Sequence, residues 1–75
     1  MPRSELLEAI LQAQYELDTA EPEELAACLE RLHALVDEIT AGTRLTRREL
    51  LSALRDRYHN YKRARLIEEH RRRSV

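Results

Sequence analysis

The chain has 75 residues, of which 43% are hydrophobic and 36% charged, with one glycine, two prolines, one cysteine and no tryptophan or phenylalanine. This length allows one domain with one core, and the single cysteine excludes a disulfide within the chain. The short apolar runs exclude a membrane-spanning helix, and the scarcity of strand-favouring residues predicts an all-α protein.

Charge is strongly segregated along the chain, although the net charge is only −1. Residues 1–42 contain ten acidic and two basic residues, whereas residues 43–75 contain four acidic and eleven basic residues. Two explanations remain open for this segregation. The two parts neutralise each other within one chain or across a dimer, or they form a surface for nucleic acid or an acidic partner.

The first predicted helix covers residues 4–18. Ser4 is the expected N-cap, and Glu5 suits the positive end of the helix dipole. The apolar side recurs at helical spacing, with Tyr15 at its edge, and consists of Leu6, Leu7, Ile10, Leu11, Gln14 and Leu17.

The second predicted helix covers residues 22–40. Pro22 suits the first helical position, where its missing N–H costs nothing. Gly42 is expected to end the helix in the left-handed conformation. The apolar stripe has the spacing of a bundle helix and consists of Leu25, Cys28, Leu29, Leu32, Leu35, Val36 and Ile39.

The third predicted helix covers residues 47–72 and begins at a capping box formed by Thr46 and Glu49. Its apolar stripe ends at Tyr61, because Leu66 and Ile67 point away from it. We therefore expect residues 62–75 to form a basic C-terminal helical extension or a frayed tail. Residues 1–75 are thus predicted to form a single helical domain, a small three-helix bundle made of an antiparallel hairpin and a long, overhanging third helix. The stripe consists of Leu50, Leu51, Leu54, Tyr58 and Tyr61.

The sequence gives little indication of catalytic or metal chemistry. Carboxylate and histidine recur at i, i+3 in residues 30–33 and 56–59, a spacing used in di-iron bundles, but both pairs fall largely outside the leucine stripes. Cys28 lies at the edge of a stripe, as expected of a structural thiol. We therefore expect that the protein is not an enzyme and that it holds no metal and no cofactor.

The pattern favours a small non-enzymatic protein–protein interaction protein, such as an adaptor, regulator or co-chaperone, that self-associates. A lone cysteine and the absence of a signal-peptide pattern predict a cytoplasmic location. The expected partner interface consists of Tyr58, Tyr61, Arg65, Leu66 and Ile67. The alternative is a nucleic-acid-associated regulator that binds phosphates through the basic face of the third helix. The expected phosphate contacts are Arg48, Arg55, Lys62, Arg63 and Arg73.

Two short stretches resemble known helical hairpins. Residues 35–42, LVDEITAG, resemble the turn region of the small subunit of exonuclease VII. Residues 16–33, ELDTAEPEELAACLERLH, resemble the turn of the RNA-binding Rop family. Both resemblances cover a fraction of the chain and reflect general properties of helical hairpins, so they imply no functional residues here.

Overall fold

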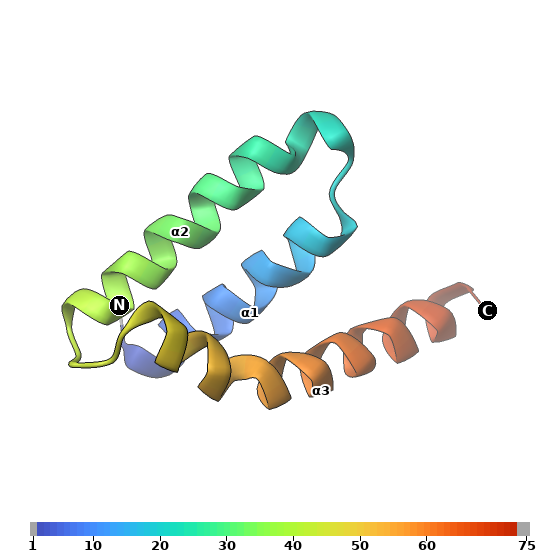
Figure 1. The fold of residues 1–75 in the computed structure, drawn as a ribbon. Helices are drawn as coiled ribbons and strands as arrows, with labels where there is room; N and C mark the ends of the chain where they lie inside the picture. Colours follow the sequence, from blue (N-terminus) through green and yellow to red (C-terminus); the bar gives the residue numbers. More distant parts are fainter. Residues whose placement is uncertain (1, 74–75) are drawn as a thin grey trace.

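The computed structural model describes residues 2–73, and this part of the chain is all-α, as the sequence predicts. Helix α1 spans Arg3–Thr19, a short 3₁₀ turn spans Pro22–Glu24, α2 spans Leu25–Ala41 and α3 spans Arg47–Arg73. Helices α1 and α2 form an antiparallel hairpin (Figure 1). Helix α3 starts beside the end of this hairpin, follows α1 and diverges from α2, so the bundle is open on one side.

Helix α1 begins before its predicted N-cap. Pro2 occupies the cap position with an extended backbone (φ −58°, ψ 149°), and its carbonyl accepts a 3.0 Å hydrogen bond from the N–H of Leu6. Arg3 is therefore already helical, and Ser4 lies inside the first turn. The prediction of a Ser4 cap is wrong because the proline carbonyl closes the turn without a side-chain cap.

Helix α2 ends at Gly42, but not in the predicted left-handed conformation. Gly42 has φ −92° and ψ −1°, in the right-handed region. The last turn tightens, with the N–H of Gly42 donating to the Ile39 carbonyl at 3.3 Å and that of Thr43 donating to the Thr40 carbonyl at 3.3 Å. The Thr43 hydroxyl also donates to the Ile39 carbonyl at 3.2 Å. These bonds satisfy the terminal carbonyls without a positive φ.

Helix α3 begins at the predicted cap. The backbone N–H of Glu49 donates to the Thr46 hydroxyl at 3.2 Å, which satisfies one of the free donors of the first turn. The Glu49 carboxylate accepts a 3.1 Å hydrogen bond from the Thr46 hydroxyl rather than from its backbone N–H. The cap therefore forms half of the expected reciprocal box.

The core lies where the three helices meet, near the connection between α2 and α3 (Figure 1). Its buried cluster consists of Leu6, Ile10, Leu11, Ala13, Leu32, Val36, Ile39, Leu50 and Leu54. The predicted stripes are buried only in part. Leu25 and Leu29 of α2 are 44% and 43% exposed, and Leu51 of α3 is 48% exposed. Leu25 and Leu29 lie on the half of α2 from which α3 diverges, and Leu51 lines an open groove on α3.

No helix within residues 2–73 is long and apolar enough to cross a membrane.

Candidate interaction surface

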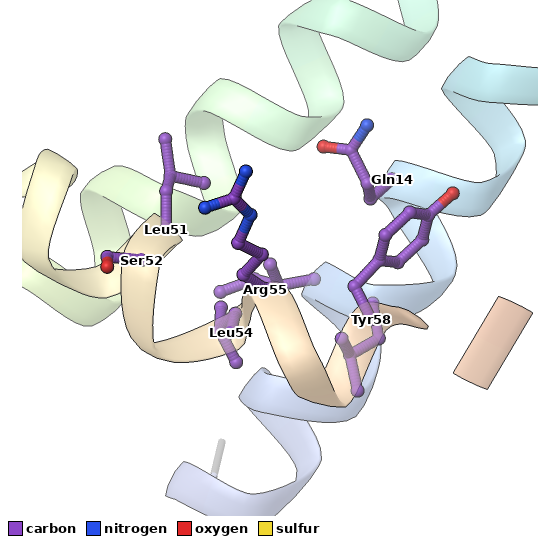
Figure 2. Close-up of a pocket in the computed structure, with 8 residues that line it drawn as sticks. Gln14, Leu51, Ser52, Leu54, Arg55 and Tyr58 are labelled. Carbon is purple, nitrogen blue, oxygen red and sulfur yellow. The ribbon is translucent and has the colours of Figure 1, made fainter. Parts of the chain in front are cut away.

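A groove of about 390 Å³ lies between α1 and α3 on the open side of the bundle. Ile10, Leu11 and Leu54 supply buried apolar surface, while Leu51 and Tyr58 are more exposed. Figure 2 shows side chains from both helices in the space that separates α3 from α2. The polar side chains that line the groove are Gln14, Ser52 and Arg55. An apolar cleft with a few polar side chains around it is the kind of surface that accepts an amphipathic helix.

A second apolar surface lies on the first half of α2. We name Leu25 and Leu29 the α2 patch. They continue the stripe that Leu32, Val36 and Ile39 bury further along the helix. Helix α3 has diverged from α2 at this level, so the patch is left open (Figure 1). Sequence periodicity identified this apolar face, and the structure buries only its second half within the chain.

The carboxyl-terminal part of α3 is attached to α1 through Tyr15. This tyrosine is only 4% exposed, and its hydroxyl donates to Oε1 of Glu69 at 3.0 Å. The Arg65 guanidinium carbon lies 5.0 Å from the centre of the Tyr15 ring and 5.9 Å from that of Tyr61. The two rings meet edge to face, with centroids 6.2 Å apart. These aromatic and cation–π contacts hold α3 against α1 beyond the end of its apolar stripe.

The environment of two phenols disfavours their ionisation. Burial raises the pKa of Tyr15, and the hydrogen bond to Glu69 and the charge of this carboxylate raise it further. Burial also raises the pKa of Tyr58, and the hydrogen bond that its hydroxyl donates to Asp18 acts in the same direction. Both phenols therefore stay protonated as donors to carboxylates, which suits a structural role.

The five residues of the expected partner interface fall into two groups. Tyr58, Tyr61 and Arg65 contact α1 and are half-buried within the chain. Leu66 and Ile67, in contrast, are 50% and 51% exposed. The sequence predicted that Tyr15 lies at the edge of the apolar side of its helix, and Glu69 was not identified as its partner. The available signal was that Arg65 and Glu69 follow Tyr61 at spacings of four residues, on one face of α3.

The five expected phosphate contacts, Arg48, Arg55, Lys62, Arg63 and Arg73, are exposed along α3. Within residues 2–73 none of them forms an ion pair. Arg55 also lines the groove. Their helical spacing leaves them on one broad sector, so the structure keeps this basic surface accessible without bringing it to a concave nucleic-acid site.

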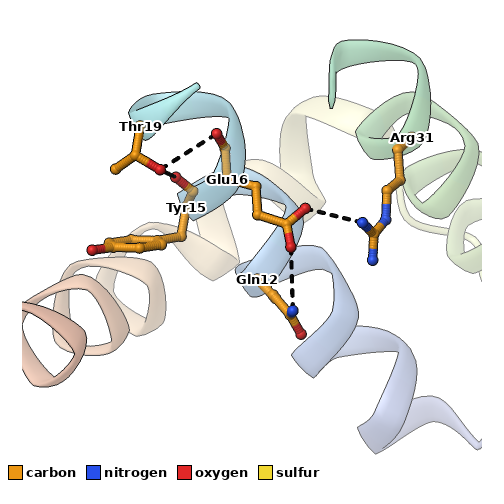
Figure 3. Close-up of polar contacts among 5 residues, drawn as sticks. All are labelled: Gln12, Tyr15, Glu16, Thr19 and Arg31. Atoms are coloured by element: carbon orange, nitrogen blue, oxygen red, sulfur yellow. Dashed lines mark hydrogen bonds and ion pairs between the residues drawn. The ribbon is translucent and has the colours of Figure 1, made fainter. Parts of the chain in front are cut away.

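The acidic and basic parts of the chain neutralise each other very little. Figure 3 shows a 3.0 Å ion pair between Glu16 and Arg31, which connects α1 to α2 within the acidic part of the chain. The pair of Arg72 and Glu68, also 3.0 Å, lies within α3. In the described chain, only the ion pair between Arg47 and Asp37 joins the acidic part to the basic part. The complementary charges are thus left largely available for another molecule.

Among residues 2–73, no group of three or more histidine, cysteine, aspartate and glutamate side chains is placed to hold a metal ion. Cys28 is a free, half-buried thiol.

No family model, curated protein or solved structure matches this chain, so the two hairpin resemblances gain no support from these comparisons.

Proposed function

We propose that this chain is a small non-enzymatic protein that acts by binding protein helices, as an adaptor, regulator or co-chaperone, and that it self-associates. The observation that carries the proposal is the uncovered apolar surface on α2 and α3. Each of Leu25, Leu29, Leu51, Leu66 and Ile67 is more than two-fifths exposed. A chain of this size gains only about 3–5 kcal/mol from its core, so a partner that covers such residues contributes substantially to the assembled state.

The overall dimensions support the same proposal. The chain exposes 5958 Å², about 1,100 Å² more than the roughly 4,800 Å² expected of a folded monomer of its mass. Its radius of gyration is 13.5 Å, against about 11 Å for a compact domain of 75 residues. The excess area is similar to the roughly 800 Å² that each partner contributes to a specific protein interface.

We also propose a cytoplasmic location. A lone, half-buried thiol is compatible with a reducing compartment, where cysteines are not needed as disulfides.

Light scattering on purified protein tests the self-association. We expect a dimer or larger oligomer at about 100 µM, consistent with a modest interface of this area. Leu29→Asp, which places a charge in the α2 patch, should give a monomer. The matched control is Ala34→Asp, which adds the same charge to an exposed position on the opposite side of α2 and should leave the oligomer intact. A wild-type chain that stays monomeric at this concentration would refute self-association.

The second candidate function is that of a nucleic-acid-associated regulator, favoured by the row of exposed basic side chains on α3 that form no ion pair within residues 2–73. Binding through phosphates releases counterions that are condensed on the nucleic acid. Added salt reduces the free energy gained by this release, so the affinity falls steeply as the salt concentration rises. A fluorescence-anisotropy titration of generic duplex DNA and of RNA at low and physiological salt tests this function. Lys62→Ala together with Arg63→Ala should weaken binding and reduce its salt dependence. No binding of the wild-type chain at low salt would exclude this candidate.

A further inference from the structure

We propose that the partner of the α2 patch is the carboxyl-terminal segment of α3 from a second copy of this chain, so that two copies form a symmetric dimer. This inference rests on the proposed self-association and specifies its geometry. We name residues 62–73 the α3 extension. Leu66 and Ile67 of this extension would cover Leu25 and Leu29 of the other copy, and the reciprocal contact would form at the same time.

Charge complementarity selects this pairing. The α3 extension has six basic residues against two acidic ones, while residues 16–30, around the α2 patch, have six acidic residues and no basic one. Within the described chain Arg72 pairs with Glu68 inside the extension, and no arginine or lysine of the extension forms an ion pair with α2. Opposite charges beside exposed apolar residues fix the partner and the orientation of paired helices.

Pairing of two α3 extensions with each other is disfavoured by the same charges. Leu66 and Ile67 could pack against their own copies, but that contact would bring two strongly basic segments together. Nor does the extension cover the α2 patch of its own chain. The contact of Tyr15 with Glu69 keeps the extension on α1, and the end of α3 lies away from α2 (Figure 1).

The sizes of the two surfaces are compatible. Twelve helical residues span about 18 Å, and the stretch from Leu25 to Leu32 spans roughly 10 Å, so the extension covers the patch with about one and a half turns to spare in total. Each symmetric dimer would contain this contact twice. A weak individual contact can therefore be stabilised by its repetition.

Charge-reversal variants test the geometry. One variant carries Glu23→Lys and Glu30→Lys beside the α2 patch, and the other carries Arg71→Glu and Arg73→Glu in the α3 extension. At the substituted positions, either homodimer would place like charges together in both contacts, whereas the mixed dimer would again pair opposite charges there in both. We expect each variant alone to dimerise about tenfold or more weakly than the wild type. An equimolar mixture should dimerise within about threefold of the wild type, because the opposite charges are restored.

Analytical ultracentrifugation measures the dimer dissociation constants, and circular dichroism verifies that each variant remains helical. Should a variant lose helicity, cysteine exchange replaces the charge test. Chains with Cys28→Ser and Leu25→Cys are mixed with chains with Cys28→Ser and Ile67→Cys, and the mixed disulfide should exceed both homodisulfides. If the wild type dimerises but the charge reversals do not weaken dimerisation, or the equimolar mixture of the two variants stays monomeric, this geometry is overturned while self-association still stands. A wild-type chain that never dimerises overturns both.

Discussion

Two leucines on one helix test whether the first half of α2 is uncovered in the single chain. Leu32 is 6% exposed and Leu29 is 43% exposed, although both belong to the same sequence stripe. Truncating a buried leucine to alanine removes its transfer free energy and leaves a cavity, at a cost of about 2–5 kcal/mol. Leu29→Ala removes a side chain that is nearly half in water and leaves no closed cavity, so we expect a cost of about 1 kcal/mol.

The assay is urea unfolding followed by far-ultraviolet circular dichroism, at a concentration low enough to keep the chain monomeric. Because the core of a domain this small rarely supplies more than about 3–5 kcal/mol, Leu32→Ala should lose most of its helix at 25 °C. Leu29→Ala should remain folded, with its urea midpoint lowered slightly. Equal losses for Leu29→Ala and Leu32→Ala would contradict the open arrangement of α2 and α3.

The same pair of variants responds to concentration in different ways. Assembly stabilises the folded state by mass action, so the wild-type urea midpoint should rise as the protein is concentrated. Leu29→Ala should show a smaller rise, because its α2 patch is diminished. A concentration dependence that Leu29→Ala leaves unchanged would place the self-association surface elsewhere on the chain.

Three further substitutions test the helix ends and the tyrosine contacts. Gly42→Ala should raise the free energy of unfolding by about 0.4–1 kcal/mol, since φ is negative there and an added Cβ meets only a carbonyl oxygen at 3.8 Å; a loss of stability would instead indicate the left-handed conformation. Thr46→Ala should lower it by about 1 kcal/mol through loss of the cap, with Thr46→Ser as the control that keeps the hydroxyl; equal midpoints in urea for all three chains would argue against the cap. The raised pKa of Tyr58 means that its stabilising effect is complete below about pH 10 and is lost as the pH rises through the folded-state pKa. In urea titrations above pH 10, Tyr58→Phe should therefore lose less stability than the wild type. Parallel losses for the two chains would refute this contribution.

The helix limits could be predicted from sequence because their signals are local. Pro22, predicted as the first residue of the second helix, begins the 3₁₀ turn that leads into α2 three residues later, and Thr46 with Glu49 marks the start of α3. Two of the local errors, at Ser4 and Gly42, have the same physical origin. In each case backbone carbonyls and N–H groups completed the turn by themselves, so the side chain or conformation expected there was not required.

The extent of burial was less predictable, because it depends on how far neighbouring helices stay together. Periodicity identifies the apolar face of α2 but contains no information on where α3 leaves it. Leu25 and Leu29 were therefore grouped with Leu32, although they are 44% and 43% exposed and Leu32 is 6% exposed. Tyr15 was predicted only at the edge of its apolar side, but it is 4% exposed because a distant part of the chain covers it. Its partner Glu69 is 54 positions away in the chain, and only the crossing of α1 and α3 brings them together.

The attachment of α3 to α1 bears on why Leu66 and Ile67 remain exposed. By apolar spacing the core-facing stripe of α3 ends at Tyr61, but the same face continues with Arg65 and Glu69, which contact Tyr15. The helix is thus held on α1 for two turns beyond its apolar stripe, and this hold fixes the rotation of α3 about its own axis. With that rotation fixed, Leu66 and Ile67 cannot turn inward without breaking the contacts of Tyr15. Tyr15→Ala should therefore increase amide hydrogen exchange in residues 65–70. Leu66→Ser should lower monomer stability by no more than about 1 kcal/mol, as expected of a half-exposed leucine, and should clearly weaken the association with a second chain.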